Sequence, residues 1–235
     1  NRIIEVDPAR RLARVEPGVT NLEISQAAAP HGLYYAPDPS SQVACTIGGN
    51  VAENSGGVHC LKHGLTVHNL LETRVATIDG EWLTLGSPAG DAPGLPLLSL
   101  LTGSEGMLGV VVEATVRLKP LPERVELLMA AFADVRRCAD AVGRIIASGI
   151  VPAGLEMMDE PAIRAAEAFV RCGYPTDAAA LLLCELDGLE HDVQHDLQAV
   201  EALLRACGAT TLRIAHERPE APILLIPPLM IAAEV

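Results

Sequence analysis

The segment TIGGNVAENSGG, which runs from Thr46 to Gly57, decides how the first half of this chain is interpreted. Its four glycines are interleaved with small polar residues, so the main chain can approach a neighbouring group closely, and clustered N–H groups can bind anions. The spacing matches neither the dinucleotide fingerprint G-x-G-x-x-G nor the phosphate-binding loop G-x-x-x-x-G-K-[ST]. The pattern alone leaves two interpretations open: a glycine-rich binding loop, or tight structural turns between packed elements.

Short strands separated by turns are predicted on both sides of this segment. Alternating apolar residues and the dipeptides Asp-Pro, Pro-Gly and Asp-Gly are typical of β-structure. The predicted strands are Ile3–Val6, Leu12–Val15, Leu71–Ile78, Trp82–Leu85 and Val110–Leu118. A helix capped by Thr20 or Asn21 is expected to end near Ala28. Pro37 and Pro39 exclude a regular strand, so a rigid extended loop is predicted there.

The rhythm of the sequence changes after Pro122, where strands alternate with amphipathic helices. The predicted strands are Val125–Phe132, Gly154–Met158, Ala179–Leu186 and Thr210–Ala215. The predicted helices are Val135–Ser148, Ile163–Arg171 and Val193–Ala206. This order suggests a four-stranded sheet with its main helices on one face, ferredoxin-like in outline. A domain boundary is expected near residues 120–124, and the proline-rich residues 217–235 fit no regular element.

Composition limits the classes of partner. The formal net charge of −13 disfavours nucleic acid, since it would repel a phosphate backbone. Six cysteines without a C-x-x-C pair, in a long chain without a secretory signal, indicate reduced and mostly buried thiols. No apolar run reaches the roughly 20 residues of a membrane span, so a cytoplasmic protein is expected, with peripheral attachment at the inner membrane left open.

Histidines and carboxylates give weaker indications. His59 and His63 are four residues apart, as are His191 and His195, but neither pair has the adjacent glutamate of a zinc protease, so no metal is expected. We expect the second pair on an exposed helix face, and the first pair in packing beside the glycine segment. Glu156 and Asp159 lie three apart on a strand, which places them on opposite faces and excludes a paired acid and base.

Three motifs together resemble a known family: PDPSS (Pro37–Ser41), the Thr46–Gly57 segment, and GSEGMLGVV (Gly103–Val111). They are similar to the FAD-binding domain of the vanillyl-alcohol oxidase/p-cresol methylhydroxylase (PCMH) superfamily. Within it they resemble the FAD-linked 2-hydroxy-acid dehydrogenases of the glycolate oxidase, D-lactate and D-2-hydroxyglutarate dehydrogenase type. The similarity extends from Ile3 to about His216.

The resemblance implies an α+β fold in two parts. Residues 1–122 would form the larger part of a PCMH-type FAD-binding domain that lacks its N-terminal βαβ half. Residues 123–216 would form an incomplete ferredoxin-like substrate (cap) domain, followed by an irregular tail at 217–235. The family's catalytic histidines lie in motifs similar to His-Ala-Gly-Asp-Gly-Asn and Gly-Glu-His-Gly-Ile-Gly, which do not occur here, so no catalytic residue is assigned.

Cofactor contacts carry over position by position. The resemblance implies that the PDPSS loop and the start of the glycine segment line the flavin ribityl chain and pyrophosphate. It implies that the later glycines pack against the flavin and that the third motif lies by the adenosine. The residues so implied are Pro37, Asp38, Ser41, Thr46, Gly48, Gly49, Asn50, Asn54, Gly56, Gly57, Gly64, Glu105, Gly109 and Val111. Position 63 departs from the family, since His63 stands where relatives usually carry Tyr.

The expected function is FAD-dependent oxidation of a small 2-hydroxy acid, of the glycolate or D-lactate type, to the 2-oxo acid. FAD would be bound noncovalently, although His59, Cys60 and His63 are weak candidates for a covalent link. Electrons would pass to a partner subunit of a glycolate-oxidase-type complex, an iron–sulfur protein. Two alternatives stay open: a non-catalytic remnant or assembly subunit that keeps the fold, and a ferredoxin-like regulatory module that binds a small effector through residues 123–216.

Overall fold

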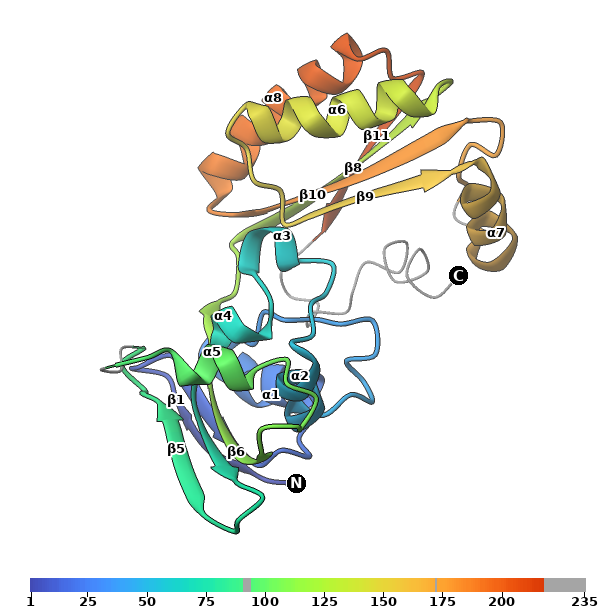
Figure 1. Cartoon of the computed structure of the whole chain (residues 1–235). Helices are drawn as coiled ribbons and strands as arrows, with labels where there is room; N and C mark the ends of the chain where they lie inside the picture. The colour runs from blue at the N-terminus through green and yellow to red at the C-terminus, as the bar shows by residue number, and fades with distance from the viewer. Residues whose placement is uncertain (91–93, 172, 218–235) are drawn as a thin grey trace. The chain divides into compact units, whose positions relative to one another are not determined.

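The computed structural model describes residues 1–90, 94–171 and 173–217. The chain divides between Leu121 and Pro122 into two compact units, each with its own sheet and helices (Figure 1). The α+β fold class predicted from the sequence is therefore confirmed. The predicted irregular tail falls almost entirely outside the described residues, except that Glu217, assigned to the tail, is the last residue of a strand.

The first unit contains two antiparallel hairpins and several short helices. In chain order, its elements are β1 (Ile3–Asp7), β2 (Leu12–Val15), α1 (Asn21–Ala28), η1 (Ala29–His31), β3 (Leu33–Tyr34), α2 (Ile47–Glu53), α3 (Cys60–His63), α4 (Thr66–Asn69), β4 (Leu70–Ala76), β5 (Trp82–Gly86), α5 (Leu97–Leu101), β6 (Val110–Arg117) and β7 (Lys119–Pro120).

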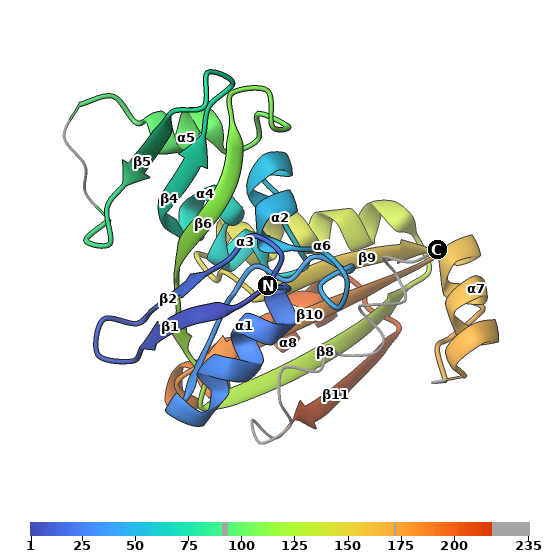
Figure 2. The same cartoon turned by 90° about the horizontal axis from the view of Figure 1, so that it is seen from below.

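The main sheet of this unit has five strands in the order β1-β2-β6-β4-β5 (Figure 2). Strand β6 therefore joins the hairpins β1–β2 and β4–β5, pairing antiparallel with β2 on one side and β4 on the other. A separate two-stranded ladder pairs β3 with β7, with Tyr34 opposite Lys119. The β4–β5 hairpin turns at Asp79-Gly80, as its dipeptide predicts, because Gly80 adopts a positive φ of 80°.

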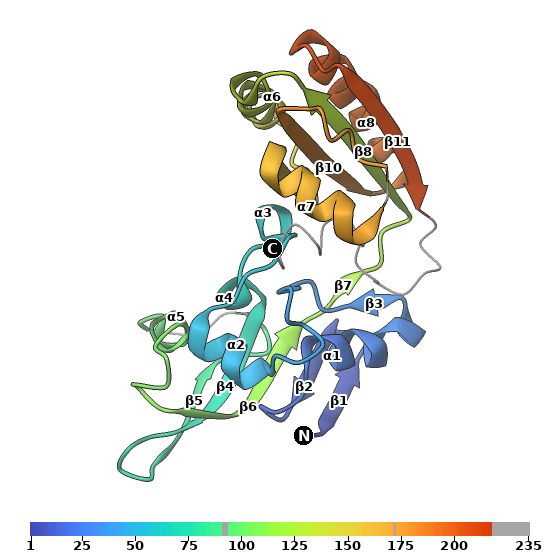
Figure 3. The same ribbon diagram turned by 90° about the vertical axis from the view of Figure 1, so that its right-hand side faces the viewer.

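One face of the five-stranded sheet is covered by α1 and α2 (Figure 3). Thr20 caps α1 in a capping box with Glu23, which fixes where that helix begins. Ile24 from α1 and Ile47 and Val51 from α2 are fully buried against sheet residues such as Val116. Burial of these aliphatic side chains stabilises the unit and fixes the position of α2 on the sheet.

The second unit is one antiparallel sheet in the order β11-β8-β10-β9. Its elements are β8 (Arg124–Phe132), α6 (Val135–Ala147), β9 (Gly154–Asp159), α7 (Glu160–Val170), β10 (Ala180–Gly188), α8 (Glu190–Ala206) and β11 (Thr211–Glu217). Helices α6 and α8 pack on one face, over a core that includes Leu128, Phe132 and Leu182, and α7 lies on the other side of the sheet (Figure 1). The strand order is that of a ferredoxin-like fold with one added helix.

Within the described residues, no helix combines the length and the apolar character that crossing a membrane requires.

Candidate functional site

The Thr46–Gly57 segment is not a loop throughout, as its glycines suggested, because seven of its residues form α2. Thr46 caps this helix, with its side-chain oxygen accepting from the N–H of Gly49 at 3.4 Å. Asn54 ends it in the left-handed conformation, which Asn tolerates better than most residues. The caps, together with the burial of Ile47 and Val51 against the sheet, offset the low helix propensity of the paired glycines.

Two N–H groups at the start of α2 are bonded within the chain. Ile47 donates to the carbonyl of Val19 and Gly48 donates to the carbonyl of Pro17, both at 2.8 Å. A Cβ on Gly48 would lie 2.7 Å from Cβ of Pro17, so the close approach of the Pro17 turn requires glycine there. Packing within the chain therefore accounts for Gly48, and its N–H is not available to a ligand.

Gly49 is different. A Cβ at this position would meet only Oγ1 of Thr46, at 3.5 Å, an ordinary van der Waals contact. The helical backbone does not require glycine either, and glycine costs about 1 kcal/mol relative to alanine inside a helix. Nothing in the described part of the chain accounts for the missing side chain.

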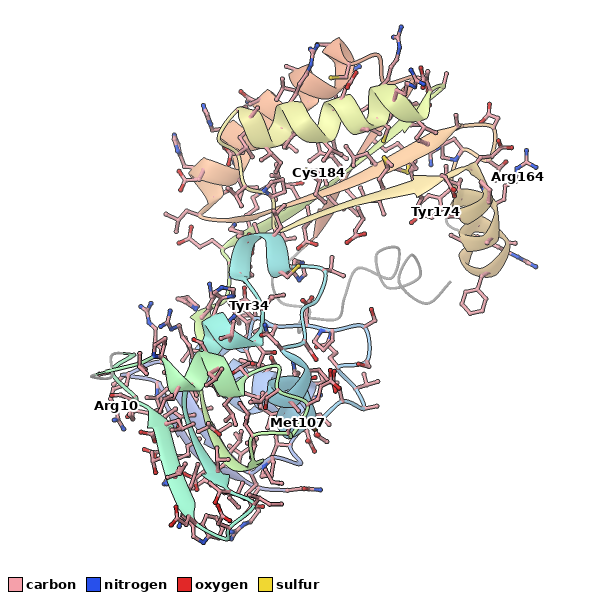
Figure 4. All side chains as sticks on the ribbon, in the orientation of Figure 1. Arg10, Tyr34, Met107, Arg164, Tyr174 and Cys184 are labelled. Atoms are coloured by element: carbon pink, nitrogen blue, oxygen red, sulfur yellow. The ribbon has the colours of Figure 1, made fainter. Side chains whose placement is uncertain are left out.

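The Gly103–Val111 segment lies directly against the end of α2. The N–H of Gly103 donates to the carbonyl of Val51 at 2.8 Å, and the N–H of Glu105 donates to the carbonyl of Ala52 at 2.9 Å. Gly103, Glu105 and Gly106 all have positive φ angles, so the segment turns tightly, and Met107 projects from it into solvent (Figure 4). Two motifs about fifty residues apart in the sequence thus form one surface.

A pocket of about 470 Å³ lies between these two segments. The first segment lines it with Thr46, Gly48, Gly49, Val51 and Ala52, and the second with Ser104, Gly106, Gly109, Val110 and Val111; Asn1, Pro17, Gly18 and Leu101 complete the wall. None of these lining side chains is an acid, although the chain carries a net charge of −13. The pocket therefore suits an anionic ligand better than the overall charge suggests.

Five of the predicted contact residues line this pocket: Thr46, Gly48, Gly49, Gly109 and Val111. The other nine lining residues were not among the predicted contacts: Asn1, Pro17, Gly18, Val51, Ala52, Leu101, Ser104, Gly106 and Val110. A signal was available for most of them, because Pro17-Gly18 was predicted as a turn, and Ser104 and Gly106 stand within the third motif. What the sequence lacked was the hydrogen bonding that brings the third motif to the end of α2.

The remaining predicted residues lie outside the pocket wall. Asp38 is buried and its Oδ2 contacts Nδ1 of His59 at 2.5 Å, while Gly57 has no room for a Cβ because the main chain of Asp38 lies against it. The buried Nδ2 of Asn50 donates to Oδ1 of Asn21 at 2.6 Å. Oδ1 of Asn54 accepts from the N–H of Val67 at 3.0 Å. These polar groups hold the unit together.

Four further predicted residues have main-chain roles. The carbonyl of Pro37 accepts from Nδ2 of Asn21, and the carbonyl of Ser41 accepts from the N–H of Cys45. A Cβ on Gly56 would meet Leu65, and Gly64, with a φ of 76°, ends α3. The local turns and contacts of the chain therefore account for these two carbonyls and these two glycines.

Metal and thiol chemistry receive little support from the geometry. No group of three His, Cys, Asp or Glu side chains suitable for a metal ion occurs among the residues that the structure describes. His191 and His195 are exposed on α8, as predicted. Asp159 accepts from the N–H of Ala162 and caps α7. Burial raises the pKa of the Cys138 thiol to about 11 and that of Cys184, which also lies near Glu185, to about 12, so both are neutral at physiological pH.

Comparisons with known proteins find two matching domain families. Residues 1–86 match the FAD binding domain, and residues 121–224 match the C-terminal domain of FAD linked oxidases. The chain belongs to the FAD-linked oxidases. Among curated relatives of this FAD-linked oxidase chain, glycolate oxidase subunit GlcD of Escherichia coli K12 is 62% identical over 93% of the chain. The GlcD of Bacillus subtilis 168 is 40% identical over 94%, and a D-lactate dehydrogenase of Anaerostipes hadrus is 32% identical over 92%.

This FAD-linked oxidase chain spans less than half the length of these relatives, 44% of the E. coli protein and 47% of the other two. Its fold is also that of a solved alkyldihydroxyacetonephosphate synthase, which superposes with a TM-score of 0.79 at 20% identity. That superposition covers 98% of the chain and 43% of the synthase. The FAD-linked oxidase thus combines part of an FAD-binding domain with the C-terminal domain of its family.

Proposed function

We propose that this chain forms part of an FAD-dependent 2-hydroxy-acid dehydrogenase of the glycolate oxidase type, with one wall of a noncovalent FAD site in the first unit. Residues 1–122 would act as the larger part of the FAD-binding domain and residues 123–216 as the substrate-side domain. The names of the relatives, glycolate oxidase and D-lactate dehydrogenase, support a small 2-hydroxy acid as substrate.

The observation that carries the proposal is Gly49, a glycine that neither the backbone conformation nor a neighbouring atom of the chain requires. Gly49 lies on the wall of the acid-free pocket, and its missing side chain is explained if a ligand occupies the space that a Cβ would take. A pyrophosphate group is anionic and demands close approach of the main chain, so both features of the wall fit this part of FAD.

Each pocket residue has a proposed task. The hydroxyl groups of Thr46 and Ser104 would donate to phosphate oxygens, since both are small and line the pocket. Val51 and Val111 would exclude water from the apolar parts of the ligand. The other residues implied by the family resemblance remain part of the proposed site, although the side chains of Asp38 and Asn50 are engaged by His59 and Asn21.

Bound flavin would supply the hydride acceptor for oxidation of the 2-hydroxy acid. The task of this chain would be to hold that cofactor and, through its second unit, to cover the substrate. We propose further that the electrons leave through a partner subunit of a glycolate-oxidase-type complex, an iron–sulfur protein.

The FAD affinity of matched glycine variants tests the proposal. FAD binding to the full chain is measured by equilibrium titration, followed through flavin fluorescence. Gly143 provides the control, because it is also a helical glycine whose Cβ would have open space, but it lies on α6 in the second unit. Because the chain would supply only one wall of the site, we expect the wild-type chain and Gly143→Ala to bind FAD weakly and with equal affinity, and Gly49→Ala to bind it at least about tenfold more weakly still.

Turnover distinguishes the catalytic proposal from its alternative. Reduction of an artificial acceptor by the FAD-loaded chain with glycolate or D-lactate would support the dehydrogenase. Absence of measurable FAD binding, or FAD binding without turnover, would support a non-catalytic subunit that keeps the fold. Equal affinity for FAD in Gly49→Ala and in the wild type would contradict the proposed cofactor site.

A further inference from the structure

The chain passes from the first unit to the second within the segment KPLPE, residues 119–123, and the boundary falls between Leu121 and Pro122. Connections between domains are ordinarily exposed, flexible linkers that few contacts cross. Here main-chain hydrogen bonds hold the chain on both sides of the boundary, and each of these bonds lies wholly within one unit. The freedom of the connection is therefore confined to very few residues.

On the side of the first unit, the chain is held by the β3–β7 ladder and its continuation. Strand β7 pairs antiparallel with β3, and Pro120 lies opposite Leu33 in that register (Figure 3). One residue further on, the N–H of Leu121 donates to the carbonyl of Gly32 at 2.9 Å. The first unit therefore holds the main chain up to the nitrogen of Leu121.

On the side of the second unit, Glu123 is held by both its main chain and its side chain. Its N–H donates to the carbonyl of Gly188 at 3.0 Å. Its Oε2 accepts from the N–H of Glu190 at 3.2 Å. This second bond caps α8, whose own N-cap residue, Leu189, makes no side-chain capping bond. The second unit therefore holds the main chain from the nitrogen of Glu123 onward.

The next residue, Arg124, adds charge-assisted contacts to the same anchor. Its Nε donates to Oε1 of Glu126 at 2.6 Å, and that carboxylate is buried in the second unit. Its Nη1 donates to Oε1 of Glu190 at 3.3 Å. Hydrogen bonds between ionised groups are stronger than neutral ones, and a buried partner fixes their direction. Glu123 and Arg124 therefore move with the second unit.

Leu121 and Pro122 carry the backbone freedom that is left between the two anchored nitrogens. The ring of Pro122 fixes its own φ angle. A residue that precedes proline is confined to extended conformations, which restricts Leu121 as well. The ψ angle of Pro122 is the main torsion that can still change. Because proline has no N–H, a rotation at this residue breaks no main-chain N–H bond of its own.

We propose that Pro122 is a stiff hinge of one residue, about which the two units reorient as rigid bodies over a restricted range. The range is restricted because each unit holds the chain up to the hinge and because proline removes most of the remaining torsional freedom. The hinge involves no residue of the pocket and requires no FAD, so it stands or falls independently of the proposed cofactor site.

Residual dipolar couplings of the backbone amides test the hinge on the full chain in a weakly aligning medium, without cofactor. The couplings of each unit give the degree of alignment of that unit. Units joined by a stiff hinge align to nearly the same degree, whereas a loose joint averages the couplings of one unit. We expect nearly equal alignment of the two units in the wild type. In Pro122→Gly the ratio of the two alignments should fall by about half, because glycine releases φ at this position and the restriction on Leu121.

Two further variants assign the effect to the junction. An insertion of two glycines between Leu121 and Pro122 leaves every residue of both units in place, and it should lower the ratio further than Pro122→Gly does. Pro175→Gly is the matched control, because Pro175 lies in a loop within the second unit. Its carbonyl accepts from the N–H of Ala178 at 3.0 Å, and glycine keeps that carbonyl. The control should align as the wild type does.

Three outcomes would overturn the proposal. Unequal alignment of the two units in the wild type, as low as in the glycine insertion, would show that Pro122 does not stiffen the connection. Equal alignment in the wild type, Pro122→Gly and the insertion would show that the junction does not control the orientation of the units. A fall in Pro175→Gly as large as that in Pro122→Gly would show that the effect does not arise at the hinge.

Discussion

The two units of this chain differ in what their tightly packed segments contact. In the second unit, strands β8 and β10 present rows of fully buried side chains, such as Leu128, Phe132 and Leu182, to the helices above them, and the packing is closed. In the first unit, the two glycine segments are packed against the chain on one side and open to a pocket on the other. A missing side chain can therefore mean that the protein fills the space, as at Gly48, or that something else does, as we propose at Gly49.

The closed packing of the second unit predicts the largest effect. The chain has two phenylalanines, Phe132, which is fully buried, and Phe169, which is 81% exposed. Phe132→Ala should lower the free energy of unfolding by about 3–5 kcal/mol, because it leaves a cavity in a core that cannot collapse freely. Urea unfolding measures the loss, and Phe169→Ala should change stability by less than about 0.5 kcal/mol. A small effect of Phe132→Ala would show that this core is not closed.

A smaller loss of unfolding free energy is expected where atoms of the chain itself occupy the space beside a glycine. A Cβ on Gly57 would overlap the carboxylate and main chain of Asp38, which cannot move freely between its prolines. Gly57→Ala should therefore cost about 1–3 kcal/mol of unfolding free energy, the range for overpacking. The same urea titration measures it, with Gly143→Ala as a variant that should not lose stability. Unchanged stability in Gly57→Ala would weaken the link between the Asp38 loop and α3.

Substitution of Gly49 is expected to change the free energy of unfolding in the opposite direction. Since a Cβ there meets no close contact and the position is helical, Gly49→Ala should raise the free energy of unfolding of the cofactor-free chain by about 0.5–1 kcal/mol. Its neighbour is the control, because Gly48→Ala brings a Cβ against Pro17 and should lower stability. Thermal unfolding of both variants checks the prediction. If Gly49→Ala is less stable than the wild type, the packing of the chain itself requires this glycine, and the main support for a ligand in the pocket is lost.

The smallest effect concerns the solvent-side charges of the five-stranded sheet. Partial burial, and then the nearby carboxylate of Glu113, raise the pKa of Glu72, and Arg14 offsets this only in part. A carboxyl whose pKa is raised on folding costs stability once it ionises, that is, as pH rises above its ordinary range. Glu72→Gln should therefore raise the unfolding midpoint slightly at pH 7 and leave it unchanged below about pH 4. A gain of equal size at both pH values would point to packing and not to charge.

The sequence predicted the second unit in nearly complete form. Strands and amphipathic helices alternate there as predicted, because the central strands β8 and β10 are continuous apolar runs buried on both faces and the helices α6 and α8 each bury one face. Val135–Ala147 and Glu190–Ala206 were both anticipated within a few residues. In this unit the secondary structure expected from the local sequence pattern is the one found in the folded structure.

The glycine segments could be predicted only in part. Four glycines within twelve residues argue against a helix, and the sequence does not show that Thr46 and Asn54 cap one. Nor does it show that Gly103 and Glu105 donate to the carbonyls of Val51 and Ala52, since such contacts depend on the folded path of the chain. The predicted cofactor contacts of the two segments remain predictions. What the structure adds is a physical distinction among the glycines.

The position of β6 has a consequence for how the first unit comes into being on the ribosome. This strand lies between the β1–β2 and β4–β5 hairpins, yet it is the last of the five to be synthesised. Until Arg117 has left the exit tunnel, the two hairpins have no shared strand, and the third motif is not yet in place against α2. Because these pairings are distant in sequence, the unit should fold late and in one step during translation, and a nascent chain stalled before Val110 should present two unjoined hairpins to chaperones.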